Sequence, residues 1–180
     1  MNSLKKFLIN VILIVIGFLI YFLQSDFFSW FSIAGVKPNL FVIYILFIGL
    51  FGNRSMGIIY GAILGICLDL IFNEKVGSNL FGLVLIGIIA TLFDKNFSKD
   101  SRITIMFMVL GSTILFEVLS FFINYIIYSI NIDIISFIKI LIIETIYNIL
   151  ITIIIYPLIQ KFGYYIENEY KGNRILTRYF

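Results

Sequence analysis

The chain has 180 residues, of which 61% are hydrophobic and 13% are charged, and its mean hydropathy is +1.08. Average globular domains are about 45–50% apolar and about 25% charged, because polar side chains must cover their surface. The composition therefore excludes an ordinary soluble domain and predicts one membrane-embedded domain. The net charge of +3 is small and the basic residues are dispersed, which argues against a nucleic-acid-binding patch.

The sequence contains no histidine, which removes the commonest general base and the commonest metal ligand. Its one cysteine, Cys67, lies in an apolar run and has no second cysteine to form a disulfide with. The acidic residues show no metal-binding spacing, and no glycine-rich loop leads into a lysine as in phosphate-binding loops. We therefore expect no catalytic residue, no metal site and no cofactor.

Six apolar runs predict an all-α bundle of six transmembrane helices, since a helical span needs about 20 residues. In chain order the runs are Phe7–Leu23, Pro38–Phe51, Met56–Phe72, Gly77–Phe93, Ile103–Tyr128 and Ile134–Gln160. The second run is too short to cross the hydrocarbon core alone. We expect it either to extend back through Ile33–Val36 or to lie tilted inside the bundle. The first run follows Lys5 and Lys6 as a signal peptide would, but no small-x-small cleavage pattern follows it, so we expect a retained helix.

The basic residues predict that both termini are cytoplasmic, because lysine and arginine are enriched in cytoplasmic loops. With six spans, ten of the 13 basic residues fall on the cytoplasmic side. These ten are Lys5, Lys6, Arg54, Lys95, Lys99, Arg102, Lys161, Lys171, Arg174 and Arg178, whereas Lys37, Lys75 and Lys139 fall outside. Residues 1–166 are expected to form the membrane domain, and residues 167–180 a short cytoplasmic tail.

Three glycines in the third run, Gly57, Gly61 and Gly65, recur every four residues, and Asp69 continues the series. A step of four drifts by only about 40° around a helix, so the four residues share one stripe. Small residues on such a stripe allow another helix to approach closely. That helix is either a neighbour within the chain or the helix of a partner protein.

Two further acids, Glu117 and Glu144, lie inside apolar runs, where carboxyl groups rarely face lipid. Counting about 1.5 Å per residue places both in the middle-to-outer part of the bundle, with Asn124 and Asn148 on the same two helices. Glu144 and Asn148 are four residues apart and share a face. We expect a polar cluster that serves as a hydrogen-bonded contact between helices, as a cavity for a polar ligand or lipid, or as a proton relay.

Motifs in the second to fourth runs carry a resemblance to a known family. Lys37-Pro38-Asn39-Leu40 opens the second run, where proline suits a first helical turn and Lys37 can reach the outer headgroups. Gly61-x-x-x-Gly65-x-x-x-Asp69-Leu70 and Gly77-Ser78-Asn79 follow, and Tyr147-Asn148 with Pro157 occurs in the last run. In their order and spacing these motifs resemble the MreD family of bacterial cell-shape proteins. Ser78 departs from the family, which usually has an apolar residue there.

The resemblance implies a non-enzymatic scaffold or regulator of rod elongation and peptidoglycan synthesis in the bacterial plasma membrane. MreD-like proteins partner MreC, a single-span (bitopic) protein with an extracytoplasmic coiled coil. They belong to an assembly with the actin-like MreB, the glycosyltransferase RodA and a class B penicillin-binding protein, surrounded by membrane lipids. The resemblance makes Lys37, Pro38, Asn39 and the glycine stripe with Asp69 candidates for partner or helix contacts.

The family is also similar in fold to the six-helix substrate-binding subunits of energy-coupling-factor vitamin transporters. A vitamin-binding subunit is therefore an alternative function, and size and span count fit it equally well. It predicts a small-residue docking face on the first span, but Phe7–Leu23 has only Gly17 and no alanine. An intramembrane enzyme is a third alternative, for which Glu117 and Glu144 would have to meet at equal depth.

Overall fold

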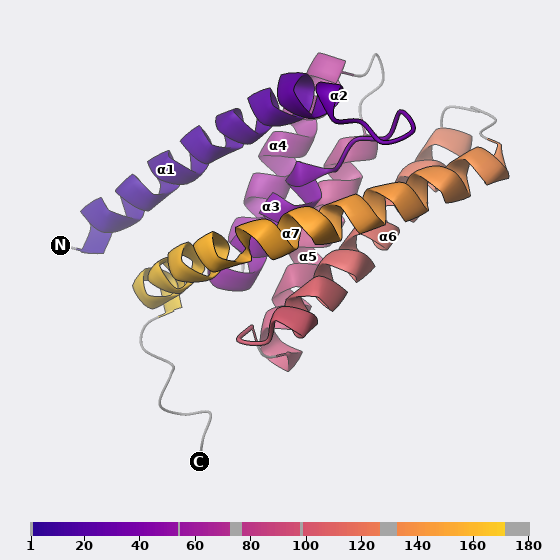
Figure 1. Ribbon diagram of the computed structural model, residues 1–180. Coiled ribbons are helices and arrows are strands. Elements are labelled where there is room, and N and C mark those ends of the chain that lie inside the picture. The colour runs from indigo at the N-terminus through magenta and orange to yellow at the C-terminus, as the bar shows by residue number, and fades with distance from the viewer. Residues whose placement is uncertain (1, 54, 73–76, 98, 127–132, 172–180) are drawn as a thin grey trace.

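The structure, a computed structural model, describes residues 2–53, 55–72, 77–97, 99–126 and 133–171. Within these residues the chain is helical and contains no strand, which confirms the expected all-α class. The elements run in the order α1 (Asn2–Phe22), the π-helix η1 (Leu23–Phe27), α2 (Phe28–Trp30), α3 (Leu40–Phe51), α4 (Met56–Phe72), α5 (Ser78–Asn96), α6 (Arg102–Ile126) and α7 (Ile134–Lys171) (Figure 1).

Four helical segments are long and apolar enough to cross a membrane: Ser3–Trp30, Ser78–Lys95, Arg102–Ile126 and Ile134–Lys171. The other two expected spans form shorter helices. Helix α3 has 12 residues and α4 has 17, so they extend about 18 Å and about 26 Å, against a hydrocarbon core of about 30 Å. All six expected spans are helices, and the number that crosses the membrane stays a prediction.

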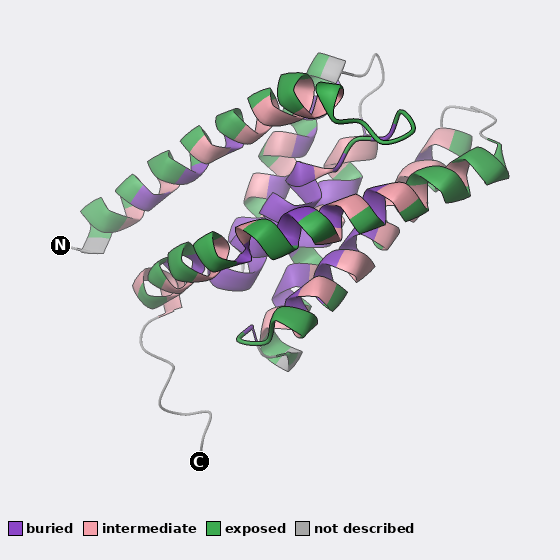
Figure 2. Cartoon of the chain, viewed as in Figure 1, coloured by how far each residue is buried: buried purple, intermediate pink, exposed green. Residues whose placement is uncertain are grey.

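Helix α3 is the centre of the bundle. All 12 of its residues are buried, and it packs against α4, α5, α6 and α7 (Figure 2). Of the two alternatives for this short run, the structure has the packed one, because Ile33–Val36 forms a tight turn instead of a helical extension. Ile33 and Val36 exchange two backbone hydrogen bonds of 2.9 Å, and the turn between them has positive φ at Ala34 and Gly35.

The start of α3 differs from the sequence prediction in one detail. Asn39 is the N-cap residue, and its side chain accepts a hydrogen bond of 3.3 Å from the backbone N–H of Val42. The helix therefore begins at Leu40, and Pro38 is buried just before the cap and does not occupy the first turn.

Helix α7 is longer than the predicted last span. It has 38 residues and runs past Gln160 to Lys171, so the first residues expected in the tail are helical. The rest of the expected tail, residues 172–180, lies outside the described residues. The outward faces of α1 and α7 carry exposed apolar side chains along most of their length, as surfaces in contact with lipid do (Figure 2).

Candidate functional site

The glycine stripe of α4 packs against α5. A Cβ atom added at Gly61 would lie 2.6 Å from the carbonyl oxygen of Leu83, and one added at Gly65 would lie 2.5 Å from the Cα atom of Leu80. At Gly57 the nearest atom, 2.8 Å away, is the Cα of Gly49 on α3. The backbones are in direct contact, so the stripe serves packing within the chain and leaves no space for a partner's helix.

Asp69 lies at the end of this stripe and is fully buried. Its carboxylate accepts backbone hydrogen bonds from Gly77 (2.8 Å), Asn79 (3.0 Å) and Leu80 (3.1 Å), and a side-chain bond of 3.0 Å from the Asn79 amide. These N–H groups belong to the first turn of α5, where the helix itself supplies no acceptor. The positive end of the helix dipole also favours a carboxylate there. Asp69 therefore fixes the start of α5 against the end of α4.

A second set of polar side chains surrounds the start of α3, which is buried inside the bundle. The backbone N–H of Asn39 donates to Oδ1 of Asn148 on α7 (2.8 Å), and the N–H of Leu40 donates to Oε1 of Gln24 in η1 (2.9 Å). The side-chain amide of Asn148 in turn donates to the hydroxyl of Thr113 on α6 (3.0 Å). Helix α7 and η1 thus supply the acceptors for the first N–H groups of α3, and α6 holds the acceptor residue Asn148 in position.

The two intramembrane glutamates join this set. The carboxyl groups of Glu117 and Glu144 contact each other across α6 and α7, and Glu144 also contacts the side-chain amide of Asn39. Oε1 of Glu144 is buried without a hydrogen-bond partner among the described residues, as are the hydroxyls of Ser112 and Thr145. Buried polar atoms are normally paired, so each of these three atoms keeps an unused hydrogen-bonding capacity inside the bundle.

The structure brings together three of the four predicted cluster residues, Glu117, Glu144 and Asn148. They are joined by Asn39, which the sequence motifs made a contact candidate, whereas Asn124 lies elsewhere on α6. Its side-chain oxygen accepts a hydrogen bond of 3.4 Å from the hydroxyl of Ser78 at the start of α5. Lys37 is exposed and donates to the hydroxyl of Ser29 (2.6 Å). The described residues contain no group of three or more His, Cys, Asp or Glu side chains that could hold a metal ion.

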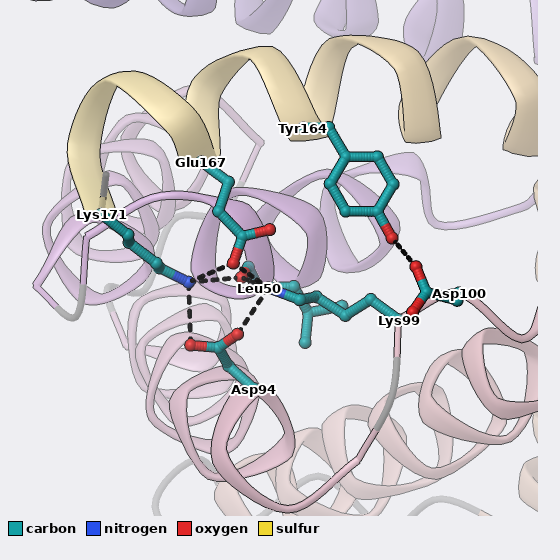
Figure 3. A network of polar contacts seen from close by, with 7 residues as sticks. All are labelled: Leu50, Asp94, Lys99, Asp100, Tyr164, Glu167 and Lys171. Carbon is teal, nitrogen blue, oxygen red and sulfur yellow. Dashed lines mark hydrogen bonds and ion pairs between the residues drawn. The ribbon is translucent and has the colours of Figure 1, made fainter. Parts of the chain in front are cut away.

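An ion-pair network that the sequence analysis did not predict lies at the other end of α3 (Figure 3). Lys99, only 6% exposed, contacts Asp94 at 2.6 Å and Glu167 at 2.5 Å. Lys171 contacts Asp94 at 2.8 Å and Glu167 at 3.7 Å. Both ammonium groups also donate to the carbonyl oxygen of Leu50, at 3.1 and 2.8 Å. Cations suit a helix C-terminus, so this network caps the buried end of α3.

Further contacts attach α7 to its neighbours at the same end. The hydroxyl of Tyr164 donates to the carboxylate of Asp100, as Figure 3 shows. Helix α1 is joined to α7 by an ion pair of 3.3 Å between Lys5 and Glu169, and by the hydroxyl of Tyr170, which lies 3.0 Å from the side-chain oxygen of Asn10. The beginning of the chain and the end of the long last helix therefore lie side by side (Figure 1).

With this geometry in place, comparison with known proteins assigns the chain to a family. The family model described as the rod shape-determining protein MreD matches residues 1–166 of the 180. The chain belongs to the MreD family. No curated protein and no solved structure matches the chain.

Membership in the MreD family confirms the resemblance expected from the motifs and places the chain among membrane proteins that determine rod shape. The matched region includes every residue of the glycine stripe and of the polar cluster. The likeness in fold to vitamin-transporter subunits stays a prediction. Gly17 is the one small residue of the first span. A Cβ atom added there would lie 3.7 Å from the Leu64 side chain and 3.8 Å from the Tyr44 ring, so Gly17 faces the bundle and offers no docking face on the outside of α1.

Proposed function

We propose that this chain is a non-enzymatic scaffold and regulator of the rod-elongation complex, which builds peptidoglycan and maintains cell shape. The observation that carries the proposal is the MreD family match over residues 1–166. The chain would span the bacterial plasma membrane several times and bind an MreC-like bitopic protein. RodA, a class B penicillin-binding protein and MreB would belong to the same assembly.

The distribution of lysines supports a membrane orientation with both termini in the cytoplasm. Lys5, Lys99 and Lys171, three of the residues expected on the cytoplasmic side, meet acidic partners at one end of the bundle. Lys37, expected outside, belongs to the loop before α3, whose start lies at the opposite end from this network. Such a one-sided excess of basic residues is what the positive-inside rule requires.

The polar cluster supports a scaffold better than an enzyme. Asn39, Asn148 and the Glu117–Glu144 pair join the start of α3 to α6 and α7, so they hold three helices in register. In a dry interior such contacts stabilise one arrangement of helices over others. A partner that binds one arrangement more tightly would shift the population toward it, which is how a scaffold of this kind can regulate its complex.

The decisive experiment is capture of the partner. The tagged chain, expressed at native level and extracted in mild detergent, should co-purify with an MreC-like protein identified by mass spectrometry. A second tagged membrane protein of the same host serves as the control for non-specific capture. Absence of the MreC-like protein from the eluate, with the chain itself monodisperse, would count against the proposal.

A complementation experiment separates the scaffold from an intramembrane enzyme. Cells depleted of the native protein should lose rod shape and regain it with the wild-type chain. Glu117→Gln and Glu144→Gln keep the size and hydrogen bonding of the two side chains but remove their acid–base chemistry. We expect both variants to restore rod shape, and loss of shape with normal membrane levels of the variant would favour a chemical role for the pair.

A further inference from the structure

A cavity of about 390 Å³ opens beside the ion-pair network, at the end of the bundle where the lysines gather. Asn53 lines it from the segment after α3, Thr91 and Lys95 line it from α5, and Tyr170 and Lys171 line it from α7. Its volume lies within the usual range for small-ligand sites, about 300–1,000 Å³. Most of its lining residues carry a hydrogen-bonding or charged group.

The charges around the cavity leave one cation uncommitted. Asp94 also lines the cavity, but its carboxylate is neutralised by Lys99 at 2.6 Å and Lys171 at 2.8 Å. Lys95 is exposed and makes no hydrogen bond or ion pair within the described part of the chain. Lys95 therefore gives the cavity a surplus positive charge, and Tyr170 and Asn53 line the same cavity.

The position of the cavity indicates where its ligand comes from. It lies at the ends of α5 and α7, where these apolar helices give way to the polar residues that follow, which is the level of the lipid headgroups in a membrane-spanning bundle. Basic pockets between transmembrane helices on the cytoplasmic side are typical binding places of anionic lipid headgroups. A soluble phosphate compound would share the charge but would not need a site at the membrane surface.

We propose that this cavity binds the phosphate headgroup of an anionic phospholipid of the inner leaflet, with Lys95 as its principal charge contact. The bound headgroup would lie between the end of α5 and the end of α7 and would join these two helices through its phosphate oxygens. The inference uses the membrane orientation of the proposed function but does not require a protein partner. Failure to capture an MreC-like protein would leave it intact.

The test is native mass spectrometry of the full chain in detergent with added phosphatidylglycerol, and in parallel with phosphatidylcholine, which has no net charge. Wild type should retain one phosphatidylglycerol molecule more strongly than any phosphatidylcholine. Lys95→Gln should weaken phosphatidylglycerol binding about fivefold, the effect expected for one lysine near an anionic headgroup. Lys95→Glu should abolish the preference for the anionic lipid.

The matched control is Lys161→Gln, which removes an exposed lysine of α7 that does not line the cavity. It should leave phosphatidylglycerol binding within twofold of wild type. Equal losses in the Lys95 and Lys161 variants would overturn the proposal in favour of general attraction to a basic surface. Inorganic phosphate at about 10 mM should not displace the lipid. Displacement would overturn the proposal and would instead indicate a site for a soluble phosphate compound. Size-exclusion profiles that match wild type establish that the exposed substitutions leave the fold intact.

Discussion

Replacing Asp69 should destabilise the bundle more than replacing any exposed acid of the chain. The carboxylate accepts three backbone N–H groups at the start of α5, and in Asp69→Ala all three buried or partly buried donors lose that acceptor. A net contribution of roughly 1 to 1.5 kcal/mol for each bond gives a loss of about 3 to 4.5 kcal/mol. At about 2–4 °C per kcal/mol for a chain of this size, the melting temperature should fall by about 10 °C.

The assay is thermal unfolding of the purified protein in one detergent, followed by size-exclusion chromatography after heating. Asp133→Ala is the matched control, because Asp133 also caps a helix but is exposed and accepts one backbone N–H, that of Ser136 at 3.2 Å. An exposed cap is worth about 1 kcal/mol, so this variant should lose only about 2–4 °C. Equal losses in the two variants would refute the reasoning, because they would mean that burial of the Asp69 cap adds nothing.

Three further substitutions probe the packing and the two ends of α3 in the same assay. Gly61→Ala should lower the melting temperature, because its Cβ would lie 2.6 Å from the Leu83 carbonyl oxygen in a backbone contact that cannot relax locally. Lys99→Met should cost about 3 kcal/mol, the low end for a buried ion pair, because the two carboxylates left behind are partly exposed and keep Lys171 as a partner. Asn148→Ala should cost about 2–3 kcal/mol, because the Asn39 N–H loses its acceptor and the Thr113 hydroxyl loses its donor.

Each of these substitutions has a control of the same residue type. Gly111→Ala should be neutral or slightly stabilising, since no atom lies within 4 Å of the added Cβ in this helix. Lys161→Met removes an exposed lysine, and Asn124→Ala removes a side chain with a long hydrogen bond of 3.4 Å, so both should shift stability by little. A control that destabilises as much as its partner would contradict the structural explanation of that pair.

The sequence predicted the helices well where the signal is local. For α3 to α6 the apolar runs ended within a few residues of the observed helix ends, because hydrocarbon favours an unbroken run of apolar side chains. Helices α1 and α7 extend further, into polar residues at the ends of the bundle. The four-residue glycine spacing predicted a close helix contact, and the structure identifies the contacting helices as α5 along the stripe and α3 at Gly57. The helical rise of about 1.5 Å per residue placed Glu117 and Glu144 in the same part of the bundle, and the structure shows that their carboxyl groups meet there.

The sequence could not predict contacts that join distant segments. Gln24 bonds to a backbone group 16 residues away, Lys99 to one 49 residues away and Lys171 to one 121 residues away. Each of these side chains occurs in a polar or interfacial stretch, where a lysine or glutamine is ordinary. Their role depends on where the ends of α3 lie, and composition does not show that a short apolar run will be buried at both ends.

The polar cluster at the start of α3 and the ion-pair network at its end both follow from the shortness of this helix. A helix leaves up to four N–H groups and four C=O groups unpaired at its ends, and water usually satisfies them. With 12 buried residues, α3 ends inside the protein at both sides, where an unpaired backbone group costs several kcal/mol. Asn148 and Gln24 at one end, and Lys99 and Lys171 at the other, supply the missing partners. The intramembrane polar residues, which in the sequence resemble a binding site, thus also hold the central helix in place. A partner or lipid that breaks the contacts of the polar cluster or of the ion-pair network therefore changes the position of α3.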